Sequence, residues 1–161
     1  MFTRLYIDSL DFSRRDGELK GEVPVSELPR MADLLSDFEG KISYLLRGLT
    51  GKDGHPQLQL SVDGACNLRC QRCLNPLLYP VKLVSTLRLV NEDELDSADI
   101  EDDEVDSIPA EKRLDVLALL EEELLLSLSL APKHSLGECQ IAAEGLSRIK
   151  SPFAALVGLK K

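Results

Sequence analysis

The chain has no tryptophan, and only four phenylalanines and three tyrosines occur among its 161 residues. Its hydrophobic content of 43% must therefore form a core mainly from leucine. No apolar run approaches the length of a membrane span, which argues against a membrane partner. Residues 1–6 lack the basic-then-apolar plan of a secretory signal. We therefore expect a cytoplasmic protein whose cysteines stay reduced, as metal ligands or free thiols rather than disulfides.

Signatures of catalysis are also scarce. The sequence has no glycine-rich phosphate loop and no dinucleotide-binding fingerprint. A nucleophile needs a base within reach, and the two histidines are His55, in a predicted turn, and His134, shortly after a proline. Carboxylates are abundant, but they crowd into one run instead of forming a positioned pair. We expect that the protein is not an enzyme.

Basic residues are too few to give the chain a positive field. The formal net charge is −9, and it is unevenly spread, with residues 1–90 summing to +1 and residues 91–161 to −10. A chain of this charge would not attract nucleic acid through its overall field. Contact with nucleic acid must therefore depend on local groups of lysine and arginine.

Three of the four cysteines lie in one segment, GACNLRCQRCLNPLLYP at 64–80. A Cys-x2-Cys turn can direct two thiolates to one side and supply two of the four ligands of a structural zinc ion. Cys70 and Cys73 would form this pair, with His134 and Cys139 as the best second pair. The alternative interpretation is a turn shaped by reduced, half-buried thiols without a metal.

The cysteine spacing also resembles an iron–sulfur motif. Cys66-x3-Cys70-x2-Cys73 has the pattern by which radical S-adenosylmethionine enzymes hold a four-iron cluster. Those enzymes resemble partial α/β barrels, which need more alternating strands and helices than this chain can supply. The residue before the last cysteine, often aromatic in that family, is Arg72. The iron–sulfur enzyme is therefore the remote alternative.

Alternating apolar residues predict a series of strands. They cover residues 2–7, 18–25, 38–49, 57–62 and 81–90. Turns are expected at 13–17 and at Asp53-Gly54, and residues 26–30 are expected to form a short helical or turn segment. The strands therefore predict an antiparallel meander with the cysteine knuckle at one corner.

A helical period begins near Asp115. Its apolar stripe consists of Leu117, Leu120, Leu124 and Leu128. Asp115 caps this helix, or the helix begins earlier at Ile108-Pro109 with proline in its first turn. Glu121 to Glu123 are expected to lie largely off the stripe, while Leu125 and Leu126 widen it. The predicted fold is α+β: an antiparallel β-meander packed against one main helix in the C-terminal half, with a long acidic loop.

An acidic loop is predicted within the main domain of the chain. Residues 91–106 contain ten acidic side chains, which predicts a mobile, solvated loop at 91–107 inside a single α+β domain of residues 1–140. A sharper interpretation of this run is a nucleic-acid mimic or a docking strip for a basic partner. Residues 141–161 are predicted to be a C-terminal tail with an amphipathic, basic end.

Several of these features together resemble YceD, the bacterial family of large ribosomal RNA subunit accumulation proteins. The resemblance depends on four segments: Cys70-Gln-Arg-Cys73, the helix at 115–126, Pro132-Lys-His134 with Cys139, and the ending at 151–161. Many relatives carry a second cysteine pair after the helix, where this chain has Cys139 and nearby His134. The resemblance covers about residue 58 to the C-terminus. Cys66 lies outside the paired motif of the family, which implies that it is a strand residue.

The resemblance implies a non-enzymatic role in the synthesis, processing or stability of large-subunit (23S) rRNA. The partners would be that RNA, ribosomal proteins or assembly proteins. The candidate phosphate contacts are Arg69, Arg72, Lys82, Arg88, Lys150, Lys160 and Lys161. The alternatives are ordinary surface charge at these positions and a protein–protein interaction scaffold that does not touch RNA.

Overall fold

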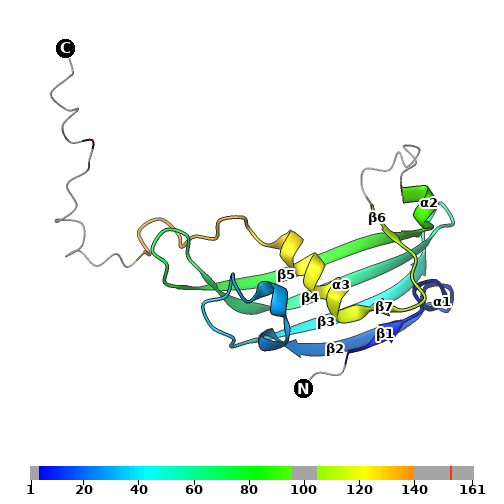
Figure 1. Cartoon of the computed structure of the whole chain (residues 1–161), viewed down its shortest axis with the longest axis horizontal. Coiled ribbons are helices and arrows are strands. Elements are labelled where there is room, and N and C mark those ends of the chain that lie inside the picture. The colour runs from blue at the N-terminus through cyan, green and yellow to red at the C-terminus, as the bar shows by residue number, and fades with distance from the viewer. Residues whose placement is uncertain (1–3, 96–104, 140–152, 154–161) are drawn as a thin grey trace, which may run out of the picture.

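A computed structural model of the protein describes residues 4–95, 105–139 and 153. Its main layer is a five-stranded sheet in the order β2-β3-β4-β5-β6, with one long helix, α3, across one face (Figure 1). The strands are β2 Glu18–Pro24, β3 Lys41–Thr50, β4 Pro56–Arg69, β5 Pro76–Val90 and β6 Asp106–Pro109. A second sheet pairs β1 Tyr6–Ile7 with β7 Leu114–Asp115. The helices are α1 Ser9–Arg14, α2 Glu92–Leu95 and α3 Val116–Ser127, with short 3₁₀ turns at Val25–Glu27 and Pro29–Met31.

The predicted α+β class and antiparallel meander are confirmed. Strands β2 to β5 pair antiparallel in sequence order, and β4 and β5 form the longest hairpin. Strand β4 extends beyond its predicted end because Cys66 and Leu68 continue its buried alternation, and its partner β5 begins earlier than predicted, at Pro76. Strand β6 was not predicted, and it pairs parallel to β5. The cysteine knuckle lies at the reversal between β4 and β5, as expected.

The N-terminal prediction was partly wrong. The strand expected at 2–7 is limited to β1 in the described residues, and the turn expected at 13–17 begins inside helix α1. Asp8 caps this helix by accepting a hydrogen bond from the backbone N–H of Asp11. Phe12 of α1 is buried in the core, and the Ser13 hydroxyl donates to the Leu49 carbonyl. These tertiary contacts stabilise a six-residue helix that its sequence does not mark clearly.

Helix α3 begins where the first alternative placed it. The Asp115 carboxylate accepts hydrogen bonds from the backbone N–H groups of Leu117 and Ala118. The earlier start at Ile108-Pro109 is wrong, because those residues form part of β6. The predicted stripe is buried, with Leu120 and Leu124 at 1% and 0% exposure. The stripe therefore faces the sheet and joins its core.

Two details of the helix faces were wrong. Glu121 and Glu123 are buried, whereas Leu126 is 74% exposed. A Glu121 carboxylate oxygen accepts a hydrogen bond from the backbone N–H of Arg30, which lies within the second 3₁₀ turn. This contact spans 91 residues of sequence, so the helical period alone could not reveal it.

Replacement of Asp115 by alanine should lower the free energy of unfolding by about 1 kcal/mol, because two N–H groups of the first turn lose their acceptor. Asp115→Asn keeps an acceptor oxygen and should retain most of the stability. Chemical denaturation of the two variants measures the difference. Equal losses in both would show that the charge, and not the cap, stabilises this end of α3.

The acidic run has regular structure at both of its ends. Residues 92–95 form α2, and β6 begins at Asp106. The prediction of a mobile loop between them concerns residues 96–104, which lie outside the described residues, as does the predicted tail except for Phe153. In the described part of the chain, no helix is long and apolar enough to cross a membrane.

Candidate metal centre

The knuckle is a tight turn between the two longest strands. Cys70 follows β4 directly, and its backbone N–H donates to the Asn75 carbonyl at 3.0 Å. The Leu74 N–H donates to the Cys70 carbonyl at 2.9 Å. Leu74 adopts a left-handed conformation with φ of 63°, which leucine rarely takes, so the surrounding contacts must hold this turn. The turn therefore fixes the positions of both Cys70 and Cys73.

The chain returns to the knuckle after helix α3. The Gln71 N–H donates to the Pro132 carbonyl at 2.9 Å, which joins the segment after the helix to the turn. His134 and Cys139 follow on this segment. Their ligand atoms lie within 4.8 Å of those of Cys70 and Cys73, and of each other. The structure thus brings together the four residues that the sequence suggested as zinc ligands.

The distances within this group fit a tetrahedral zinc ion. The Sγ atoms of Cys70 and Cys139 are 3.8 Å apart, and His134 Nδ1 lies 3.4 Å from Cys73 Sγ and 3.8 Å from Cys139 Sγ. Zn–S bonds of about 2.3 Å and Zn–N bonds of about 2.0 Å place tetrahedral ligands about 3.8 Å (S···S) and about 3.5 Å (S···N) apart. Three sulfurs and one imidazole nitrogen are also ligands that zinc prefers.

The histidine is oriented for a metal by its second nitrogen. His134 Nε2 lies 3.0 Å from the Pro76 carbonyl oxygen. Since a carbonyl can only accept, Nε2 carries the proton and Nδ1 presents its lone pair to the three sulfurs. Metal-binding histidines are commonly held in this way by a carbonyl on the opposite ring nitrogen. Pro76 is a feature that the sequence did not reveal, because only its backbone oxygen contributes.

The electrostatics of the group favour a thiolate at Cys70. Burial by itself would raise the pKa of this thiol, but the backbone N–H groups of Cys73, His134 and Arg72 point at the sulfur and lower the pKa from 9.0 to about 5. The pKa of Cys139 is raised by burial and by its neighbours Cys70 and Cys73. Three thiolates so close together repel one another unless a cation lies between them. The Arg72 guanidinium, 3.9 Å from Cys139 Sγ, offsets part of this charge.

Cys66 does not belong to this group. Its side chain is 1% exposed within the hydrophobic core of β4, and burial raises the pKa of its thiol. Among the described residues, the metal-ligating group contains Cys70 and Cys73 without Cys66. The described residues also form a mainly antiparallel sheet and not alternating strands and helices. Both observations count against the iron–sulfur alternative.

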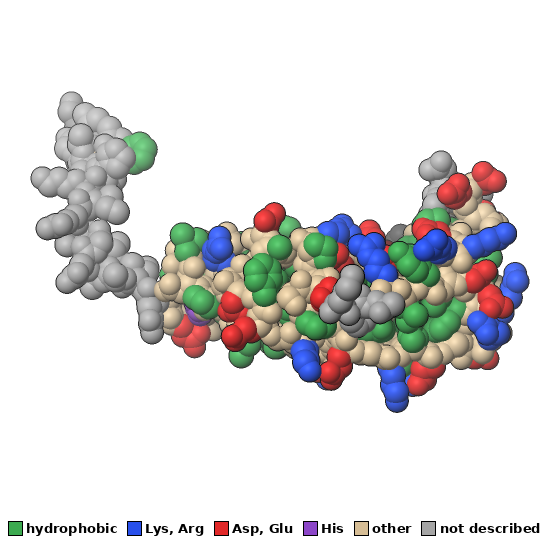
Figure 2. All heavy atoms as spheres, turned by 60° about the horizontal axis from the view of Figure 1, so that its bottom comes forward, with side chains coloured by type: hydrophobic (Ala, Val, Ile, Leu, Met, Phe, Trp, Pro, Cys, Tyr) green, Lys and Arg blue, Asp and Glu red, His purple; other side chains and the backbone are tan. Residues whose placement is uncertain are grey.

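Among the described residues, the candidate phosphate contacts do not form one surface. Arg69 and Arg72 are exposed beside the metal centre, while Lys82 is exposed further along β5. Arg88 is poorly placed for a phosphate contact, because its side chain is 8% exposed and its guanidinium pairs with Asp53 at 2.9 Å. Lys150, Lys160 and Lys161 lie outside the described residues. Figure 2 shows acidic and basic side chains mixed over the visible face, without one continuous basic surface there.

Residues 58–160 match the model of a family described as "Large ribosomal RNA subunit accumulation protein YceD". A curated relative, the large ribosomal RNA subunit accumulation protein YceD of Haemophilus influenzae, is 29% identical over 178 aligned residues. The alignment covers 98% of this chain and 95% of the relative. No solved structure matches the chain. The segment matched to the family includes all four members of the Cys/His group.

Proposed function

Because the chain belongs to the YceD family of large ribosomal RNA subunit accumulation proteins, we propose that it acts in the accumulation of large-subunit rRNA as a cytoplasmic, non-enzymatic factor. Family membership is the observation that carries this proposal. The H. influenzae relative supports it, since its alignment extends over nearly the whole chain. The partner would be large-subunit RNA or a protein that assembles with it.

The Cys/His group would serve this role as a structural zinc site. A zinc ion with four protein ligands has no open position for substrate or water, so it supplies rigidity and not catalysis. Here it would fasten the β4–β5 turn to the segment that follows α3. Three thiolates, one neutral imidazole and Zn²⁺ leave one negative charge, which Arg72 is placed to balance. The centre would therefore hold a fixed corner of the molecule with exposed arginines on it.

The RNA contact would lie at this corner. Arg69, Arg72 and Lys133 are exposed around the metal centre, and arginine can bind phosphate through two parallel hydrogen bonds. A fixed turn lowers the conformational entropy lost when these side chains bind. Such a contact is local, which reconciles RNA binding with a net charge of −9.

Binding of large-subunit rRNA fragments should weaken as salt rises, and the double variant Arg69→Ala/Arg72→Ala should show a shallower dependence. Loss of two phosphate contacts should reduce the slope of log affinity against log salt by about 1.4 to 1.8. The matched control, Arg14→Ala/Lys52→Ala, removes two exposed charges from the opposite end of the sheet and should leave the slope unchanged. The zinc content of each variant must be measured, because Arg72 also contacts Cys139. An unchanged slope in the first variant would contradict direct phosphate contact at the knuckle.

A protein partner is the second candidate, and exposed leucines favour it. Four of them lie on the segments that form or flank the metal centre: Leu74, Leu78, Leu130 and Leu136, at 66%, 70%, 105% and 91% exposure. Such side chains can anchor a protein interface. Crosslinking in growing cells distinguishes the candidates, because the corner would capture either rRNA or a ribosomal or assembly protein.

A further inference from the structure

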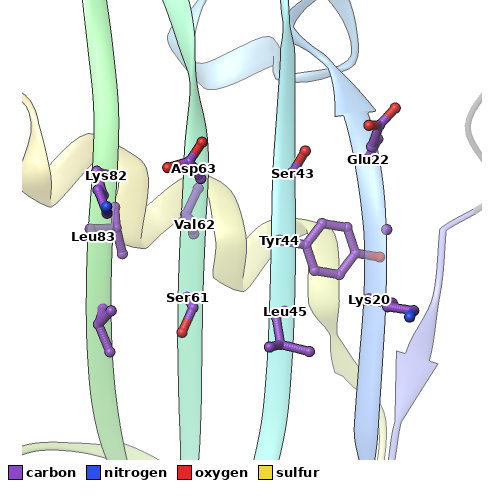
Figure 3. Close-up of a pocket in the computed structure, with 12 residues that line it drawn as sticks. Lys20, Glu22, Ser43, Tyr44, Leu45, Ser61, Val62, Asp63, Lys82 and Leu83 are labelled. Carbon is purple, nitrogen blue, oxygen red and sulfur yellow. The ribbon is translucent and has the colours of Figure 1, made fainter.

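The sheet has a second face that α3 does not cover. In Figure 3, α3 lies behind the strands and this open face points toward the viewer. The strand register aligns its side chains in two rows across four strands, since directly paired residues share a face. Row one is Lys20, Leu45, Ser61 and Val84, and row two is Glu22, Ser43, Asp63 and Lys82. The register thus places charged, hydroxyl and apolar side chains in fixed positions relative to one another across β2 to β5.

The centre of this face is hollow and apolar. A shallow cavity of about 490 Å³ is lined by the residues of both rows. Val84 is 65% exposed and Leu45 is partly exposed, while Ser43 and Ser61 leave space between them. The charged side chains stand around the hollow, two acidic and two basic. An exposed apolar hollow with balanced charges at its rim is typical of an interface and not of a bare surface.

We propose that a second copy of this chain packs face to face on this surface. The two copies are related by a two-fold axis that lies between the two sheets, parallel to the strands and midway between β3 and β4. Such an axis places β2 of one copy opposite β5 of the other, and β3 opposite β4. Sheets that pack in this way keep their strands roughly aligned, about 10 Å apart, with inward side chains in contact. We infer that the partner is a second copy because the side chains of the two rows complement the same rows on another copy of the chain.

The axis matches every charged or large side chain of the two rows with a suitable partner. In row two, Glu22 of one copy faces Lys82 of the other, and Asp63 faces Ser43. In row one, Leu45 enters the space above the other copy's Ser61, and Val84 meets the aliphatic stem of Lys20. Because the interface is isologous, each of these contacts occurs twice. No like charges face each other.

The flanking register positions extend the same complementarity. Beyond row one, Glu18 would face Thr86, and Arg47 would face Gln59. A two-fold axis across the strands is less suitable, since it would set Arg47 of one copy opposite Lys41 of the other, two like charges on β3. The face measures roughly 500 Å², below the roughly 800 Å² per partner of a standard interface. We therefore expect a reversible dimer whose population rises with protein concentration.

Exchanging the facing charges tests the proposal. Sedimentation equilibrium of the full-length protein should show a monomer–dimer equilibrium. Glu22→Lys alone should weaken it by at least about tenfold, because two lysines then meet at each pair, and Lys82→Glu alone should do the same. An equimolar mixture of the two variants should form a heterodimer as stable as the wild-type dimer, since both facing pairs are again of opposite charge.

Matched controls are Glu122→Lys on α3 and Lys52→Glu in the β3–β4 turn, exposed charge reversals away from this face that should leave the dimer unchanged. Thermal unfolding of each variant checks that the fold is intact. A monomeric wild-type protein would overturn the proposal, as would single variants that dimerise normally. A mixture that stays monomeric would overturn it as well, because the two charges would then not face each other.

Discussion

Protein purified without chelator should contain one zinc ion per chain, and Cys139→Ala should reduce that content almost to zero. Removal of one of four ligands opens a structural site, and the remaining two sulfurs and imidazole bind zinc far more weakly. The backbone N–H groups around Cys70 lower the pKa of its thiol to about 5, which favours the thiolate form that binds zinc. Elemental analysis after dialysis measures the change.

Cys66→Ala is the matched control for this experiment. It removes a thiol that lies only four residues before Cys70 but is buried in the core, so the zinc content should stay at one per chain. The variant also replaces one small apolar side chain with another, which limits its effect on packing. Loss of zinc in Cys66→Ala together with full zinc in Cys139→Ala would refute the ligand set proposed here.

Leu124→Ala should lower the free energy of unfolding by about 2–5 kcal/mol. Leu124 is 0% exposed, and it belongs to the core that α3 shares with the sheet. The substitution removes buried apolar area and leaves a cavity between two layers that cannot close fully. Since small domains are stable by only about 5–15 kcal/mol, this one change should strongly increase the unfolded fraction. Denaturant titration at constant temperature gives the value.

Leu126→Ala tests the assignment of the buried face on the same helix. Leu126 is 74% exposed and lies two residues from Leu124, so both substitutions change helix propensity equally. The exposed variant should change stability by no more than about 0.5 kcal/mol. Similar losses for the two variants would mean that α3 packs with a different face from the one described.

The features that could be predicted from sequence were those with a local signal. The alternation in β2 to β5 and the leucine period in α3 each show which face is buried, because period and burial are linked directly. The Cys-x2-Cys spacing identified the turn because a tight turn is what directs two thiols at that spacing to one side. The grouping of His134 and Cys139 with that turn required one further assumption, namely that the chain leaves α3 at the corner of the sheet.

The features that could not be predicted depend on partners distant in sequence. Strand β6 pairs parallel to β5, and its four residues carry no pattern that shows this register. Glu121 is buried because it accepts from Arg30, and Arg88 is buried beside Asp53. In each case the sequence predicts that a charged side chain is exposed. Only the fold brings the partner group that offsets the cost of burying the charge. The same holds for the Pro76 carbonyl that orients His134.

A rigid corner held by four protein ligands is the claim on which the proposed role rests. X-ray absorption at the zinc edge of the purified protein determines the ligand shell directly. We expect three sulfurs at about 2.3 Å and one nitrogen at about 2.0 Å, with no coordinated water. A shell of four sulfurs would bring in Cys66 and exclude His134, and a shell rich in oxygen would mean that zinc binds elsewhere; either result would contradict the account.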